Sequence, residues 1–333
     1  MFRFKKSILA FSLILAVLGL TSWGFLAHKT IDQIAVYALP KKLQQFFFKN
    51  IDYIVYNSVR PDVRRKDDKT EDTKHYVDID APVFGPNALE TMPESWSEAK
   101  AKFTEDTLRK YGTVCWEVVF LQEKLTRAFK NKNKDSILFY AADISHYIAD
   151  AHVPLHTSIN YDGQLSGQRG IHALWESIVP EIHIKDYNLY QNQKAVYIKN
   201  PQKEIWKAFR VSFSMLKTVL DEEKAASEGF TDKTKYKRSE RYGKMRQDYT
   251  GEFAKAYTLK LGDTVNERML ESARCVSNFW FTAWKDAGCP NLSTITDFTE
   301  ADQVKLSDEI TAWQANELIK KNLLQAKKAK EEN

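Results

Sequence analysis

The residues best suited to chemistry are histidines, which are few and stand at spacings suited to metal binding. The chain has 7 histidines in 333 residues. His146 and Asp150 are four positions apart, so on a helix both side chains project from one face. Pro154 should end or bend that helix, which lets His156 return toward the same point. Because imidazole nitrogens and carboxylate oxygens are ordinary zinc ligands, this segment predicts one side of a metal centre.

A second pair repeats the same spacing. His172 and Glu176 also lie four positions apart, and His172 is sixteen residues beyond His156. A single pair of this kind is more often a surface ion pair. Two such pairs together with His156, in a chain with so few histidines, instead favour a metal site. Helix bundles build buried metal clusters from pairs of this kind on facing helices.

Other candidate ligands come earlier in the chain. His28, Asp62 and His75 are isolated, and isolated residues of these types are usually solvated or hydrogen-bonded. These three residues are evidence for a metal site only when they are considered together with the other candidate ligands. His152 and His183 fall outside the pattern, and we expect them to be ordinary surface residues or neighbours of the site.

Helices are the elements that must position these side chains. Apolar residues recur at helical spacing over 114–129 and 265–283. A third helix is expected from Ser307, as N-cap, to about Lys330. Turn-rich segments at 58–73, 80–96 and 158–171 predict loops. The expected fold class is all-α, a multi-helix bundle with long connecting loops around the metal site, formed by residues 23–290 with a helical extension at 291–333.

The amino terminus has the pattern of a secretory signal peptide. Three basic residues precede an apolar run at 8–20, and small residues follow it. The run is shorter than the ~18 residues that span a bilayer. We expect cleavage after Ser22, which makes Trp23 the first residue, leaves no integral membrane anchor and places the protein in the periplasm or the medium. Removal of the three cations lowers the net charge from +5 to +2.

Composition excludes several classes of protein. The chain is 43% hydrophobic and 28% charged with 12 glycines, which excludes a disordered or collagen-like protein. A net charge of +5 does not by itself indicate a nucleic-acid partner. The three cysteines show no CxxC spacing, so a cysteine zinc cluster is disfavoured. Outside the cell a disulfide is allowed, and Cys275 and Cys289 could form one.

Taken together, the candidate ligands resemble those of a superfamily that joins bacterial zinc-dependent phospholipase C to the single-strand-specific zinc nucleases of fungi and plants. Its pattern is an N-terminal Trp that binds zinc through its amine and carbonyl, a nearby His, a separated Asp and His, then H-x3-D-x5-H and H-x3-[DE]. This chain fills the pattern in order, with Trp23, His28, Asp62, His75, His146, Asp150, His156, His172 and Glu176. Residues 268–274 onwards also resemble the last core helix of the family.

The resemblance implies a site with three zinc ions. Asp62, His75 and His146 would bind one, and Asp150 would bridge it to a second held by Trp23 and His28. The third would be held by His156, His172 and Glu176. Cleavage before Trp23 would supply the free amine. The implied chemistry is hydrolysis of a phosphodiester by a metal-activated hydroxide, with Asp62 as general base or as the group that orients the water.

The substrate is left open between the two branches of the superfamily. The spacing before His172 and the glutamate at 176 favour a phospholipase C-like activity, which is the main expectation. The alternative is a single-strand-specific endonuclease or 3′-nucleotidase, in which Tyr76 and Asp78 would stack on and hydrogen-bond to a base. Tyr76 packed in the core and Asp78 capping a turn is equally compatible with the sequence.

The expected partner is therefore a phospholipid or a single-stranded nucleic acid as substrate, and no protein partner is evident. Two basic stretches, Arg64–Lys66 and Lys233–Arg246, suit a phosphate backbone, although most such runs are solvated faces. The apolar loop at 81–86 suits the rim of a lipid site. A non-catalytic zinc-binding protein remains the alternative from another class.

Overall fold

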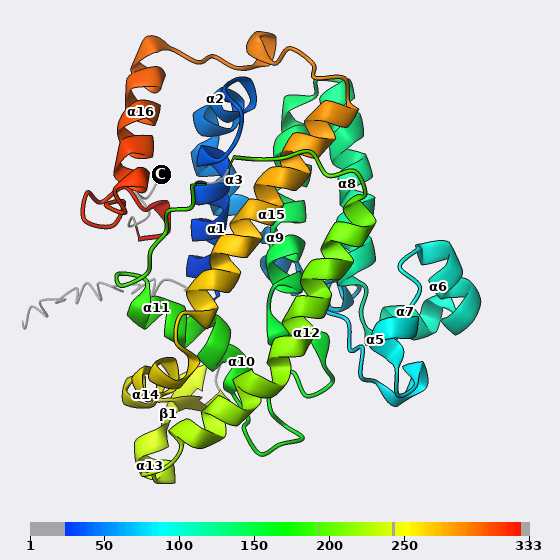
Figure 1. Ribbon diagram of the computed structural model, residues 1–333, viewed down its shortest axis with the longest axis vertical. Helices are drawn as coiled ribbons and strands as arrows, with labels where there is room; N and C mark the ends of the chain where they lie inside the picture. Colours follow the sequence, from blue (N-terminus) through cyan, green and yellow to red (C-terminus); the bar gives the residue numbers. More distant parts are fainter. Residues whose placement is uncertain (1–23, 193, 242–243, 328–333) are drawn as a thin grey trace, which may run out of the picture.

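The computed structural model describes residues 24–192, 194–241 and 244–327, and its centre is a bundle of long helices (Figure 1). These are α1 (Phe25–Tyr37), α8 (Val114–Lys130), α9 (Lys134–Ala151), α12 (Pro201–Ala226) and α15 (Thr264–Asp286). The shorter helices are α2 (Lys41–Lys49), α3 (Ile51–Asn57), α4 (Arg60–Arg64), α5 (Ala88–Thr91), α6 (Trp96–Phe103), α7 (Glu105–Tyr111), α10 (Ile171–Ala173), α11 (Val179–His183), α13 (Asp232–Lys235), α14 (Gly251–Leu261) and α16 (Glu300–Gln314). The expected all-α fold is confirmed.

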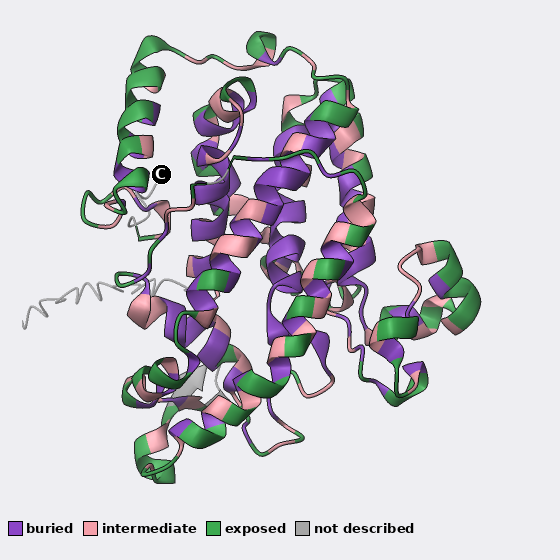
Figure 2. Ribbon diagram, viewed as in Figure 1, coloured by how far each residue is buried: buried purple, intermediate pink, exposed green. Residues whose placement is uncertain are grey.

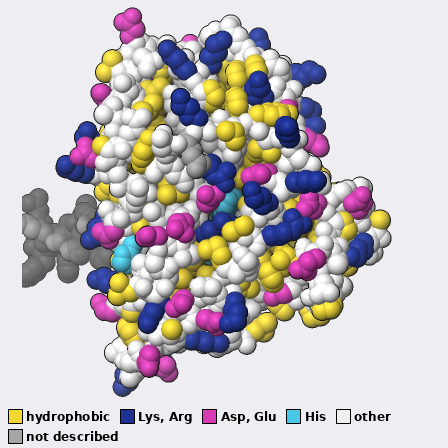
Figure 3. Space-filling model, in the orientation of Figure 1, with side chains coloured by type: hydrophobic (Ala, Val, Ile, Leu, Met, Phe, Trp, Pro, Cys, Tyr) yellow, Lys and Arg dark blue, Asp and Glu magenta, His cyan; other side chains and the backbone are white. Residues whose placement is uncertain are grey.

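The strands of the described residues form one small antiparallel hairpin beside α13. It joins β1 (Tyr236–Arg241) to β2 (Lys244–Tyr249), with Tyr236 opposite Tyr249. No helix in the described part of the chain is long and apolar enough to span a bilayer. Figure 3 shows Lys and Arg side chains scattered among acidic ones on one face of the molecule, in keeping with its small net charge.

The helix α9 runs through the core and carries the densest group of candidate ligands. The Asn133 side chain caps it by accepting a hydrogen bond from the Ser136 amide at 2.9 Å. Every residue from Ala141 to Ala151 is buried. A helix buried on all sides holds its polar side chains away from water, so these need partners inside the protein.

The predicted apolar faces of 114–129 and 265–283 are confirmed as parts of α8 and α15. Every residue that the periodicity assigns to these faces is buried, and burial of each large apolar side chain contributes about 1.5–3 kcal/mol. Figure 2 shows the burial concentrated on the central helices, whereas α6, α7 and the outer side of α16 are exposed. The two long helices therefore form two walls of the core around α9.

The predicted helix from Ser307 to about Lys330 is wrong at both ends as far as residue 327, and Lys330 itself lies outside the described residues. The helix α16 begins after Thr299, whose hydroxyl accepts from the Asp302 amide while the Asp302 carboxylate accepts from the Thr299 amide. This capping box starts the helix earlier than Ser307. The helix ends at Gln314, shortly before Asn316 takes a left-handed φ of 53°.

The segment after α15 packs back onto the bundle. In Figure 1 it crosses the top of the molecule and descends as α16 beside α1 and α2. Tyr37 of α1 donates to the buried Glu309 of α16 at 2.7 Å, and Gln33 of α1 donates to the Leu323 carbonyl at 2.8 Å. Residues 291–327 thus cover one side of α1.

Cys275 and Cys289 are free. Cys275 is buried within α15, whereas Cys289 is exposed after the end of that helix. The Cys289 amide donates to the Trp284 carbonyl at 3.0 Å, and Trp284 is nine residues, a rise of about 14 Å, along the helix from Cys275, which is beyond the reach of a disulfide.

Candidate metal centre

Eight of the nine predicted ligands lie within the described residues, and the structure brings all eight together. They form three groups, and within each the donor atoms lie within 4.8 Å of one another: His28, His146 and Asp150; Asp62, His75 and His146; and His156, His172 and Glu176. Trp23, the ninth, lies outside the described residues. His152 and His183 belong to none of these groups, and His152 is buried rather than on the surface.

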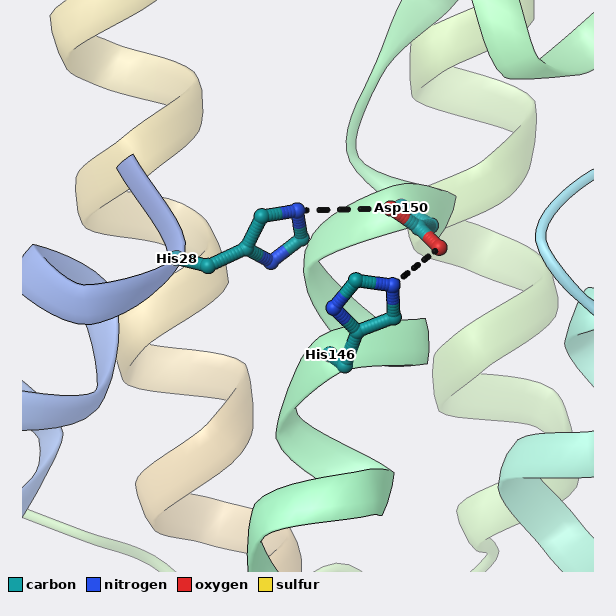
Figure 4. A group of neighbouring side chains, drawn as sticks. All are labelled: His28, His146 and Asp150. Atoms are coloured by element: carbon teal, nitrogen blue, oxygen red, sulfur yellow. Dashed lines mark ion pairs between the residues drawn. The ribbon is translucent and has the colours of Figure 1, made fainter. Parts of the chain in front are cut away.

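The first two groups meet on α9. His146 and Asp150 are one turn apart, and their side chains meet with 3.3 Å between Nε2 and Oδ2. His28, from the first turns of α1, stacks on the His146 ring with 4.2 Å between centroids, and its Nε2 lies 3.6 Å from Asp150 (Figure 4). On the other side, the His75 Nδ1 lies 2.9 Å from Asp150. The His156 Nδ1 lies 3.7 Å from Asp150 as well, so Asp150 is central, with four imidazole rings around its carboxylate.

Hydrogen bonds behind two of the rings fix which nitrogen faces the cluster. The His146 Nδ1 donates to the Ser58 carbonyl at 2.8 Å, and the His156 Nδ1 donates to the His75 carbonyl at 2.7 Å. Each Nε2 lone pair is then turned inward. Histidines that bind metals are oriented in this way by a partner on the outer nitrogen.

The third group converges on one small volume. The Nε2 atoms of His156 and His172 are 2.8 Å apart, and the Glu176 Oε2 lies 3.4 Å and 2.8 Å from them. Glu176 lies in a π-helical turn, Leu174–Ile178, a distortion common at functional sites. A Cβ on Gly24 would lie 2.9 Å from a carboxylate oxygen of Glu176, so a larger residue there would push the Glu176 side chain aside.

The charges of the cluster favour bound cations. Burial lowers the pKa of His28, but the carboxylates of Glu176 and Asp150 outweigh it and raise the pKa to about 9. Burial instead lowers the pKa of His146 to about 4. Burial would raise the pKa of Asp150, yet His146 and His156 hold it well below its usual range. Buried carboxylates facing imidazole lone pairs are a donor set that fits zinc.

The segment with Tyr76 and Asp78 passes directly beside the third group. The Val77 amide donates to the His156 carbonyl at 3.0 Å, in addition to the bond from His156 to His75. Tyr76 and Asp78 are both partly buried. Burial and the charge of Asp80 raise the pKa of Asp78 to about 7, against the lowering effect of His156. The two predicted substrate residues therefore flank the cluster.

Gly112 lets the chain approach Tyr76 from behind. It has a φ of +98°, and a Cβ there would lie 2.2 Å from the Tyr76 carbonyl oxygen. Any other residue would displace the segment that carries Tyr76 and Asp78, because both the backbone angle and the close contact require glycine.

Sequence reasoning missed the buried groups behind the cluster. Glu71 is fully buried and lies 3.8 Å from the outer nitrogen of His75. Arg64, expected in a basic stretch, pairs with Glu71 and with Asp143, and Arg65 pairs with Asp62 and Asp72. One carboxylate among 44 acidic residues has no local signal, because only the tertiary contact gives it a role.

The fold and the site define an α-helical metalloprotein whose ligands come from several helices of one bundle. Residues 23–264, well over half of the chain, match the family model described as S1/P1 Nuclease. The chain belongs to the S1/P1 nuclease family, and it is a zinc-dependent phosphodiester hydrolase. None of the curated proteins matches the chain.

Proposed function

We propose that the protein is a secreted nuclease that hydrolyses phosphodiester bonds of single-stranded nucleic acid. The observation that carries this is the family match, together with Tyr76 and Asp78 beside the third group of ligands. Bases offer a flat face for stacking and polar edges for a carboxyl group, so an aromatic ring and an aspartate suit base recognition. The family match favours this alternative over the phospholipase C-like activity expected first.

The ligand assignment belongs to the same proposal. Asp62, His75 and His146 would hold one zinc ion, and Asp150 would share it with a second at His28. The third would be held by His156, His172 and Glu176. Trp23 would complete the second site through its free amine. The match begins at Trp23, and Gly24, the next residue, lies against Glu176, which supports cleavage after Ser22 and secretion.

When bound, zinc supplies Lewis acidity that withdraws charge from the phosphodiester and makes water more acidic. The residues of the chain supply position and proton transfer. Asp62 is the most accessible of the three carboxylates in the groups, with 22% of its side chain exposed against 15% for Glu176 and 2% for Asp150. It would orient the attacking water and accept its proton at a carboxylate oxygen. Tyr76 and Asp78 would hold the adjoining base so that the phosphorus lies in line with that water.

A paired assay tests the proposal. Zinc-loaded protein, shown by mass spectrometry to begin at Trp23, is offered single-stranded RNA in one arm and phosphatidylcholine vesicles in the other. We expect RNA cleavage alone. His146→Ala should lose it by at least a hundredfold because it removes a ligand shared by two groups. His183→Ala, a histidine outside the groups, should match the wild type.

The other outcomes contradict the proposal in different ways. Lipid hydrolysis alone would restore the phospholipase reading and give the apolar loop at 81–86 a role, since Val83 is exposed there while Phe84 is buried. Zinc binding without hydrolysis of either substrate would favour a non-catalytic zinc protein. Equal loss in His146→Ala and His183→Ala would show that the three groups are not the site of the chemistry.

A further inference from the structure

An exposed aromatic surface lies next to the metal centre and has no part in it. Tyr53 of α3 is 40% exposed and Phe139 of α9 is 38% exposed. The guanidinium of Arg60, from α4, joins them. Its Cζ lies 3.9 Å from the centre of the Phe139 ring, and its Nη1 donates to the Tyr53 hydroxyl at 3.3 Å. We call Tyr53, Arg60 and Phe139 the aromatic ledge.

The ledge is held in place before any ligand arrives. Arg60 donates to the buried Asp143 through Nη2 at 2.6 Å and Nε at 3.1 Å, and to the Phe139 carbonyl at 2.8 Å. The Arg60 side chain keeps 21% of its surface exposed. Arg60 shares Asp143 with Arg64 and so keeps part of its charge, and it offers to solvent a flat cationic surface on which a planar ring can stack.

The ledge lies close to the metal centre through α9 and α4. Asp143 and His146 of α9 are buried, so at the surface the ledge and the centre are joined by the partly exposed Arg60 and Asp62 of α4. Phe139, Asp143, His146 and Asp150 are spaced by four, three and four residues, so they share one face of the helix. Arg60 also lies on the same short helix as Asp62. Seven residues of helix separate Phe139 from His146, a rise of about 10 Å. A stacked strand advances about 3.4 Å per nucleotide, so about three nucleotides cover that distance.

We propose that the aromatic ledge is a base-stacking subsite for a nucleotide about three positions from the cleaved phosphodiester. This rests on the proposed nuclease function and adds to it a preference for strands long enough to reach the ledge. Aromatic rings and arginine planes bind bases without regard to sequence, so the subsite contributes affinity rather than base specificity. A lipid surface is the other occupant that such a patch would suit, and the test separates the two.

The experiment compares two substrates that differ in length. A dinucleotide reaches only the metal centre, whereas an eight-nucleotide single strand also reaches the ledge. Tyr53→Ala, Phe139→Ala and Arg60→Lys are expected to raise KM for the eight-nucleotide strand about tenfold with kcat nearly unchanged. The same variants should cleave the dinucleotide at the wild-type rate, which also shows that they are folded.

A matched variant controls for the loss of an exposed aromatic ring. Tyr197 is 46% exposed and far along the chain from the ledge, with its hydroxyl on Asp286. Tyr197→Ala should therefore leave both substrates unaffected. A second readout is 2-aminopurine placed three nucleotides from the cleaved bond, whose fluorescence wild-type protein should quench by stacking and Tyr53→Ala should not.

Three results would overturn the inference. If the wild type cleaves the eight-nucleotide strand no better than the ledge variants do, no base binds at the ledge. If the ledge variants lose hydrolysis of phosphatidylcholine vesicles but still cleave the strand, the ledge binds lipid instead. Wild-type protein that cleaves neither strand nor dinucleotide overturns the proposed function, and the subsite with it.

Discussion

At the scale of the residue, Glu71 shows how the metal centre is supported from behind. Its carboxylate accepts two hydrogen bonds from Arg64 at 3.0 Å, one from Lys74 at 2.9 Å and a short one from Tyr147. Burial would raise its pKa, but Arg64, Tyr147 and Lys74 hold the pKa of Glu71 at about 2. It is thus a buried anion beside His75, whose other nitrogen faces Asp150.

Replacing this carboxylate should weaken both the fold and the binding of zinc. Glu71→Gln keeps the shape but removes the charge that pairs with the partly buried Arg64 and Lys74, so we expect unfolding to become easier by about 2 kcal/mol. Loss of the negative charge 3.8 Å behind the His75 ring should lower zinc affinity by about tenfold at most, because no hydrogen bond joins Glu71 to that ring. Urea unfolding of zinc-free protein and competitive zinc titration measure the two effects.

The control is Glu105→Gln, which breaks an exposed pair with Arg109 and should change stability by less than about 1 kcal/mol. Unchanged zinc affinity in Glu71→Gln would show that His75 needs no support from Glu71. The pairs His146–Asp150 and His172–Glu176 were predictable from residue type and helical spacing, whereas His28, Asp62 and His75 entered only through the resemblance to the family. Glu71 was not predictable, since its partners come from other elements.

At the scale of the element, the hairpin and the loop before His172 depend on one buried carboxylate. Glu223 of α12 is 1% exposed. It pairs with the Lys235 ammonium at 2.6 Å and accepts from the Tyr249 hydroxyl at 2.9 Å and from the Gln168 amide at 2.6 Å. The interaction ties α12, α13 and β2 to the loop that leads into α10, so it fixes where His172 enters the site.

The sequence predicted the long helices but not this hairpin. Apolar periodicity identified α8 and α15 because each buries a continuous stripe. The strands β1 and β2 consist largely of charged and polar residues, so they show no alternation and suggested only a basic stretch. What orders them in the structure is Tyr249 and Lys235 meeting Glu223, a contact between distant parts of the chain.

Glu223→Gln should therefore destabilise the protein and reduce its activity. Loss of the charge leaves the Lys235 ammonium, 13% exposed, without its partner, which costs about 3–5 kcal/mol. Thermal unfolding and nuclease rate measure the effect, and the rate should fall because the loop before His172 shifts. Asp221→Asn on the same helix breaks the exposed pair with Lys217 and should cost under about 1 kcal/mol. Equal effects of the two variants would contradict this role.

At the scale of the whole molecule, the metal centre joins elements that are far apart in the sequence. Its candidate ligands come from α1, α4, α9 and α10, from the segments between them, and from the π-helical turn that follows α10. The segment after α15 adds a further constraint by packing on α1, which carries His28, through Tyr37 and Glu309. The family match ends at residue 264, so this covering segment lies outside the matched range.

Removal of zinc should accordingly loosen the fold as well as stop the chemistry. A cation that binds only the folded chain stabilises it by about 4 kcal/mol for each site at a thousandfold excess over its Kd. Chelation should lower the unfolding temperature of the wild type by more than 10 °C, and added zinc should restore it. The count of bound ions, measured by elemental analysis, is expected to be three.

Two variants decide whether the eight clustered residues are responsible for this stabilisation. His146→Ala removes a donor from two of the three groups, so it should bind fewer ions and lose less on chelation. His183→Ala leaves every group intact and should respond as the wild type does. If chelation leaves the unfolding temperature unchanged, the groups are held together by the protein alone. Protonated His28 and His156 would then balance the charges of Asp150 and Glu176, because burial lowers the pKa of both histidines but these carboxylates outweigh it and raise the pKa of each to about 9.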